Sequence, residues 1–80
     1  MPFQRHSISP IKQMRWEDIG LRLSHVAPEL LLSISDIRAN PSKAQLEQAA
    51  TVARYTASKL AEPEKSLALT LAEELAECAA

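Results

Sequence analysis

Apolar and small residues recur at helical spacing through the second half of the chain. They begin at Leu46 and follow at alternating steps of four and three residues, and a second series starts after Pro63. Such steps place side chains on one side of an α-helix. A kink at Pro63 in one long helix is an alternative that the pattern leaves open. The two series predict a helical hairpin over 42–78 with an alanine-lined seam: Leu46, Ala50, Ala53, Ala57 and Leu60, then Leu67, Leu71, Leu75 and Cys78.

Two further helices are predicted in the first half of the chain. The first should begin near residue 10 or 14 and end at about residue 25, and the second should run from Pro28 to just before Asn40 and Pro41. Gly20 lies on the apolar face of the first helix, where a glycine favours the close approach of another backbone. The residues expected to face the core are Trp16, Ile19, Leu23 and Val26 in the first helix and Leu30, Leu31, Ile34 and Ile37 in the second.

The expected helix starts carry recognisable capping residues. Ser9 precedes Pro10, which suits an N-cap followed by proline at the first helical position. Ser42 and Gln45 have the spacing of a capping box. The chain is therefore predicted to be all-α, a compact bundle of three to four helices forming a single domain over 10–80, with a flexible N-terminal arm over 1–9.

The small size of the domain limits how much stability its own core can provide. With 80 residues, the core is expected to supply no more than about 3–5 kcal/mol. The one cysteine, Cys78, excludes an internal disulfide, so association with a partner or a second copy is the expected supplement. The sequence has no apolar stretch of membrane-spanning length and no signal-peptide pattern. We therefore expect a soluble, cytoplasmic protein.

The residues needed for catalysis or metal binding do not form any recognisable motif. His6, His25 and Cys78 are isolated from one another, and Gly20 is the only glycine, which leaves no glycine-rich phosphate loop. A bundle this small also has little room for a substrate pocket. We predict a protein that is not an enzyme, with no metal, cofactor or small-molecule substrate.

The leading functional hypothesis is a protein–protein interaction module acting through an apolar helix face. It would be a regulator, an inhibitor, or an adaptor or co-chaperone, and its partner would be another protein or a second copy of itself. A structural oligomer without a client is a further possibility. The hypothesis depends on more apolar surface than a small bundle needs, and its expected contact residues are Leu30, Leu31, Leu32, Val52, Tyr55 and Leu69.

A small dimeric DNA-binding regulator is the alternative. The net charge of −1 lacks the bulk positive charge that drives nucleic-acid binding, and the second helix begins with acidic and apolar residues rather than base-reading ones. Glu73, Glu74 and Glu77 make the last helix acidic, and the basic residues of the first helix are the nearest groups that could balance it. The basic residues expected to contact phosphates are Arg5, Lys12, Arg15 and Arg22.

Overall fold

The computed structural model describes residues 8–80, which form four helices joined by short loops. They are α1 (Pro10–Arg22), α2 (Pro28–Ala39), α3 (Lys43–Ala57) and α4 (Glu64–Ala79). The all-α bundle predicted from the sequence is confirmed. The predicted arm over 1–9 falls mostly outside the described residues, and of its last two residues Ile8 packs partly buried against the core.

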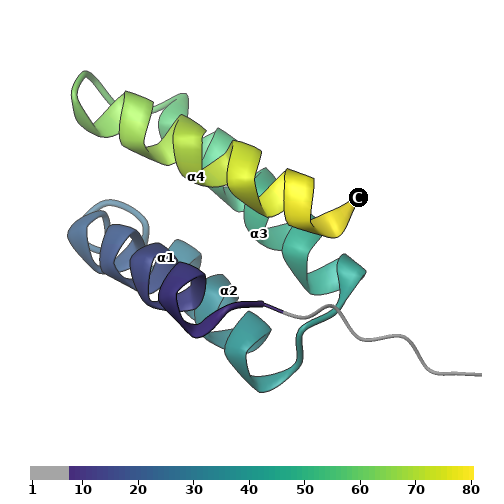
Figure 1. The fold of residues 1–80 in the computed structure, drawn as a ribbon. Coiled ribbons are helices and arrows are strands. Elements are labelled where there is room, and N and C mark those ends of the chain that lie inside the picture. Colours follow the sequence, from purple (N-terminus) through teal and green to yellow (C-terminus); the bar gives the residue numbers. More distant parts are fainter. Residues whose placement is uncertain (1–7) are drawn as a thin grey trace, which may run out of the picture.

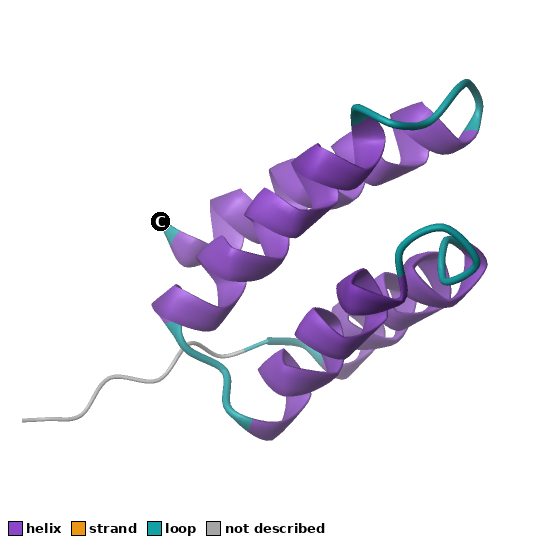
Figure 2. Cartoon of the chain, turned by 180° about the vertical axis from the view of Figure 1, so that it is seen from behind, coloured by secondary structure: helices purple, strands orange, loops and turns teal. Residues whose placement is uncertain are grey.

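The helices are arranged as two hairpins that pack on each other, α1 with α2 and α3 with α4 (Figure 1). Contact is most extensive between α3 and α4, and it is least extensive, among the pairs that touch, between α1 and α4. Within residues 8–80 neither α1 and α3 nor α2 and α4 approach closely, so the two pairs lie on the diagonals of a four-cornered bundle. Figure 2 shows the same two hairpins from behind, linked by the loop between α2 and α3. Among the described residues no helix has the length and apolar character needed to cross a membrane.

The α3–α4 hairpin answers the question that Pro63 left open. The chain turns back between Ala57 and Glu64, so Pro63 belongs to a loop and not to a kink in one helix. Proline has no side-chain oxygen to cap α4. The carboxylate of Glu62 does this instead, because its Oε1 accepts bonds from Ser66 N at 3.1 Å and Ser66 Oγ at 2.6 Å. Both bonds lower the pKa of Glu62, and the bond from the Ser66 hydroxyl has the larger effect.

Small residues fill the seam of this hairpin, as predicted. Ala53 and Ala68 have no exposed surface, and Ala50, Ala57, Ala72 and Ala79 are almost as deeply buried. Alanine side chains let two helix axes come close, towards the short end of the usual range of about 8–10 Å. Leu60, Leu67 and Cys78, which were expected to extend the seam, are only partly buried.

Local signals place the start of helices α1 and α3. Ser9 Oγ accepts the Lys12 amide at 3.1 Å ahead of Pro10, and Ser42 Oγ accepts the Gln45 amide at 3.2 Å. The bonds described for residues 8–80 include no reciprocal bond from the Gln45 side chain. Each serine satisfies one amide that has no partner within the helix.

The first helix is shorter than predicted. It ends at Arg22, and residues 23–26 form a turn in which Ser24 Oγ donates to Leu21 O at 2.7 Å. Val26 therefore leaves the face that it was expected to share with Trp16, and it is exposed. The third helix likewise ends at Ala57, short of Leu60.

The close crossing predicted at Gly20 is confirmed. A Cβ atom on this residue would lie 3.1 Å from Ile34 Cδ1 and 3.3 Å from Leu31 Cα. The second distance is to backbone, so α1 and α2 approach here more closely than any side chain on Gly20 would comfortably allow. This crossing sets the geometry of the α1–α2 hairpin that carries the site described next.

Candidate functional site

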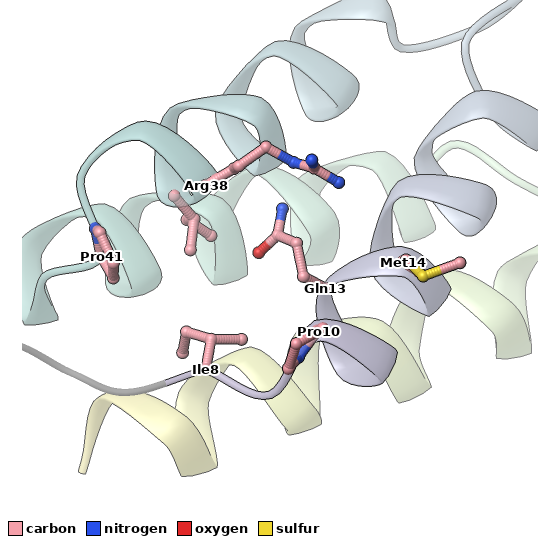
Figure 3. Close-up of a pocket in the computed structure, with 7 residues that line it drawn as sticks. Ile8, Pro10, Gln13, Met14, Arg38 and Pro41 are labelled. Atoms are coloured by element: carbon pink, nitrogen blue, oxygen red, sulfur yellow. The ribbon is translucent and has the colours of Figure 1, made fainter.

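A pocket of about 320 Å³ opens at the end of the α1–α2 hairpin where α1 begins and α2 ends (Figure 3). Its volume falls at the lower end of the range of about 300–1,000 Å³ that is usual for ligand pockets. Arg38 and Gln13 are the polar side chains that line it. The rest of its lining is apolar: Ile8, Pro10, Met14, Ile37 and Pro41.

Gln13 is the unusual residue of this pocket, because its amide is buried and only half satisfied. The side chain is 6% exposed, and Nε2 donates to Ile34 O at 3.1 Å and to Glu17 Oε2 at 2.9 Å. Both of these partners are acceptors, so the nitrogen and the oxygen of the amide cannot exchange places without losing both bonds. The oxygen, Oε1, is buried with no hydrogen-bond partner among the described residues. Figure 3 shows it on the side of Gln13 that faces the pocket, but neighbouring atoms cover it.

An ion pair between α1 and α2 holds the Gln13 amide in this orientation. Arg38 donates to both carboxylate oxygens of Glu17 at 2.7 Å, a bidentate arrangement that fixes the carboxylate as well as the guanidinium. The bonds from Arg38, and after them the bond from Gln13, lower the pKa of Glu17. The same pairing raises the pKa of Arg38. Glu17 therefore stays charged and keeps accepting from the Gln13 nitrogen, which leaves the oxygen facing the pocket.

The outward side of α1 carries three exposed apolar side chains, one of which also lines the pocket. Ile11, Met14 and Leu21 are 76%, 63% and 62% exposed, and Met14 also lines the pocket. Met14 and Leu21 are seven residues apart, which places them on the same side of the helix two turns from each other. We call these three residues the α1 apolar face. It lies opposite the side of α1 that carries the buried Trp16.

The run Leu30–Leu32, expected to form a contact surface, is divided by the rotation of helix α2. Leu30 has no exposed surface, which confirms its predicted place in the core and contradicts its predicted contact with a partner. Leu31 is half-buried, with its backbone against Gly20. Leu32 is 66% exposed and is the only one of the three that faces outward. Successive residues of a helix point about 100° apart, so three adjacent leucines cannot share one face.

The other residues predicted to bind a partner lie on different helices. Val52 is half-buried against the core, and Tyr55, one turn further along α3, is exposed with Lys59 Nζ 4.2 Å from the centre of its ring. Leu69 is partly exposed on α4. None of the pockets described for residues 8–80 is lined by Leu32, Tyr55 or Leu69.

The basic residues of α1 are engaged by carboxylates. Arg15 pairs with Glu74 of α4, and Arg22 Nε donates to Asp18 Oδ2 at 3.2 Å. Burial alone would raise the pKa of Glu74, but the bonds from Arg15 and from the Trp16 indole hold it below its ordinary value.

The remaining two basic residues predicted to contact phosphates are placed differently. Lys12 Nζ lies 3.6 Å from Cys78 Sγ of α4. Arg5 lies outside the described residues. Within the described chain, no three histidine, cysteine or acidic residues are placed to hold a metal ion.

Sequence reasoning missed Gln13, Ile11, Met14 and Leu21. The seven-residue spacing of Met14 and Leu21 could have indicated a second apolar face on the first helix. The sequence holds no comparable signal for Gln13, because a glutamine in a helix is usually exposed. Its burial depends on the crossing of α1 and α2.

Comparison with protein-family models, with curated proteins and with solved structures gives no match for this chain.

Proposed function

We propose that this chain is a small, non-enzymatic protein-interaction module. It binds an apolar segment of another protein on the α1 apolar face and in the adjoining pocket. The observation that carries the proposal is the presence of three exposed apolar side chains on α1, Ile11, Met14 and Leu21, of which Met14 also lines the adjoining pocket.

The α1 apolar face offers substantial binding energy. Fully burying a leucine, isoleucine or methionine side chain contributes about 1.5–3 kcal/mol, and three such side chains stand more than 60% exposed along one helix. Nothing in the described bundle covers them. A partner segment lying along α1 would bury all three, as apolar helix faces do in recurrent modes of peptide recognition.

The extent of this surface favours a macromolecular partner over a small molecule. The pocket is of modest size, and Leu21 lies two helical turns beyond Met14 along α1, past Asp18, which pairs with Arg22. A small ligand would fill the pocket and leave the rest of the face exposed. A peptide segment would occupy both.

The ion pairs of α1 weigh against the DNA-binding alternative. Arg15 and Arg22 would each have to exchange a carboxylate for a phosphate, which reduces the electrostatic gain on binding. If the alternative were correct, duplex DNA would be retained at low salt and released steeply as salt rises. Charge reversal at Arg15 and Arg22 would abolish that retention.

Selection from a displayed library of random peptides tests the proposal. Selected peptides should perturb the NMR signals of Ile11, Met14 and Leu21, and leave those of Leu32 and Leu69 unchanged. Failure to select any peptide, or perturbation confined to Leu32 and Leu69, would contradict it.

Self-association through the same face is the competing outcome. Light scattering behind a sizing column, over a hundredfold dilution, distinguishes the two. A mass that stays at twice that of the chain and falls to the monomer in Met14→Glu would assign this face to a second copy.

A further inference from the structure

We infer that the partner segment is an amphipathic α-helix that runs antiparallel to α1 and carries an acidic side chain four residues before a basic one. The acidic group binds Arg22, and the basic group binds Asp18. This inference deepens the proposed function and rests on it. It names the chemistry and the direction of the segment that covers the α1 apolar face.

The Asp18–Arg22 ion pair lies within the surface that such a segment covers. Asp18 follows Met14 by four residues and precedes Leu21 by three, and these steps place the three side chains on one side of the helix. Arg22 follows Asp18 by four residues, and its Nε donates to Asp18 Oδ2 at 3.2 Å. A segment that lies over both Met14 and Leu21 therefore lies over this ion pair as well.

The ion pair has accessible atoms that a partner can bind. The side chains of Arg22 and Asp18 are 68% and 60% exposed, whereas Glu17 and Glu74, the carboxylates of the other ion pairs described for α1, are 26% and 27% exposed. Among the bonds described for residues 8–80, Arg22 donates through Nε and Asp18 accepts through Oδ2. The Nη1 and Nη2 atoms of Arg22 and the Oδ1 atom of Asp18 can therefore bind a partner while the pair stays intact.

A neutral pair of opposite charges favours a partner that carries one charge of each sign. Apolar surface laid over the pair removes its water, which costs free energy unless new polar groups replace that water. A partner with charges of one sign would be repelled by either Asp18 or Arg22. A partner that presents an acid to Arg22 and a base to Asp18 is attracted by both.

The order of the two charges sets the direction of the partner helix. In α1 the acid Asp18 precedes the base Arg22 by four residues. In a helix that runs the opposite way, the residue facing Arg22 comes first and the residue facing Asp18 comes four residues later. An acid followed by a base at this spacing also stabilises a helix better than the reverse order does. The antiparallel direction therefore satisfies both α1 and the partner's own helix.

The same alignment places partner residues opposite the α1 apolar face. Counted from the acidic residue of the partner, the positions facing Leu21, Met14 and Ile11 come one, eight and eleven residues later. In a helix these positions and the two charged ones lie on one side. Apolar residues at the three positions would cover the three exposed side chains of α1.

A second copy of the chain fits this alignment poorly, although its own α1 carries an acid before a base. If Asp18 of one copy faced Arg22 of the other in an antiparallel pair, Met14 would lie opposite Val26. Val26 belongs to the turn that follows the end of α1 at Arg22. The two α1 helices would then overlap only over 18–22. A longer helix of another protein is therefore the better occupant.

The test compares two designed helical peptides of identical composition and about four turns. Both carry leucine at the three apolar positions. One has Glu four residues before Arg, and the other has these two residues exchanged. Fluorescence anisotropy with the full chain should show that the acid-first peptide binds at least about fivefold more tightly at low salt, with a difference that shrinks as salt rises. Equal affinities, tighter binding of the exchanged peptide, or no binding of either would overturn the inference.

A charge-swapped protein removes the effect of the peptides' own helix content. Asp18→Arg combined with Arg22→Asp should invert the preference between the two peptides. Lys43 and Glu47 are also exposed and four residues apart, on α3, so Lys43→Glu combined with Glu47→Lys is the matched control and should keep the wild-type preference. Circular dichroism checks that both variants fold. An unchanged preference in the folded Asp18→Arg, Arg22→Asp protein would overturn the inference.

A spin label on the amino terminus of the acid-first peptide tests the direction in the wild-type protein. The label should broaden the NMR signals of Leu21 and Arg22 more than those of Ile11. Stronger broadening at Ile11 would mean a parallel helix and would overturn the inference. This measurement decides the question even if the charge-swapped protein does not fold.

Peptides selected from the random library separate this inference from the proposed function. Selected peptides that bind the α1 apolar face and carry an acid four residues before a base would support both. Selected peptides that bind this face without such a pair, and bind Asp18→Asn, Arg22→Gln as tightly as the wild type, would overturn the inference and leave the proposed function standing. If no peptide is selected, both fail.

Discussion

Trp16 of α1 and Glu74 of α4 join the two hairpins through a hydrogen bond, in which the indole Nε1 donates to the carboxylate Oε1 at 3.0 Å. Trp16 has no exposed surface, and Arg15 pairs with the same carboxylate oxygen from the solvent side. The α1–α4 contact is the least extensive among the helix pairs that meet, and Glu74 accepts from two α1 side chains across it.

Glu74→Ala should lower the free energy of unfolding by about 1–3 kcal/mol, because it leaves the buried Trp16 N–H without a partner. Urea denaturation followed by Trp16 fluorescence measures the change. Glu73→Ala is the matched control, since Glu73 is exposed and adjacent, and its effect should stay within about 0.5 kcal/mol. Equal effects in the two variants would show that the Trp16–Glu74 bond contributes nothing specific.

Stability should fall as the pH drops below about 4.5. Glu17 and Glu74 both have a pKa lowered from 4.5 by their partners in the folded protein. A lowered folded pKa contributes stability that is fully present above the unfolded value and is lost as pH falls through the folded value. Urea midpoints between pH 7 and pH 3 test this. The slope should be shallower in Glu74→Gln than in Glu73→Gln, and identical slopes would remove Glu74 from the explanation.

Gly20→Val should lower the free energy of unfolding by about 1–3 kcal/mol, the usual cost of overpacking. Its side chain would meet Leu31 Cα and Ile34 Cδ1, which lie 3.3 and 3.1 Å from the position of a Cβ atom. Ser35→Val introduces the same side chain on the exposed side of α2 and should change stability little. If both variants unfold at the same temperature, the helices that cross at Gly20 accommodate a larger side chain without loss of stability, which would contradict this prediction.

Ala53→Leu should also destabilise the protein by about 1–3 kcal/mol, because Ala53 has no exposed surface in the α3–α4 seam. Ala44→Leu, on the exposed side of α3, is its control and should be close to neutral. Chemical denaturation of the two variants tests whether the seam is as tight as it is predicted to be. A neutral Ala53→Leu would contradict it.

Much of the fold could be predicted because it depends on local pattern. Ser9 and Ser42 are N-cap residues that mark the helix starts, and the alanines at 50, 53 and 57 recur at the spacing of one helix face. Gly20 was identified as a crossing point because a glycine within a helical pattern needs a packing reason. The Arg15–Glu74 pair was anticipated only in outline, as a basic first helix near an acidic last one.

The candidate site was much harder to predict, because it depends on how the helices cross. Leu30 and Leu32 are the same residue type, yet the orientation of α2 about its axis buries the first and exposes the second. Gln13 is buried where α1 meets α2, and there its Nε2 donates to the Ile34 carbonyl. Such relationships between distant residues carry no signature in sequence spacing, so the sequence pointed to Leu30–Leu32 and overlooked the α1 apolar face.

The most direct test of the proposed function is the affinity of a selected peptide for Met14→Glu and for Leu32→Glu. Met14 and Leu32 are 63% and 66% exposed, so the two substitutions are matched in cost to the fold. Fluorescence anisotropy with a labelled peptide should show binding weakened at least about tenfold by Met14→Glu, a loss of about 1.4 kcal/mol, and changed less than about twofold by Leu32→Glu. Unchanged binding to Met14→Glu together with lost binding to Leu32→Glu would contradict the proposal and place the interaction surface on α2.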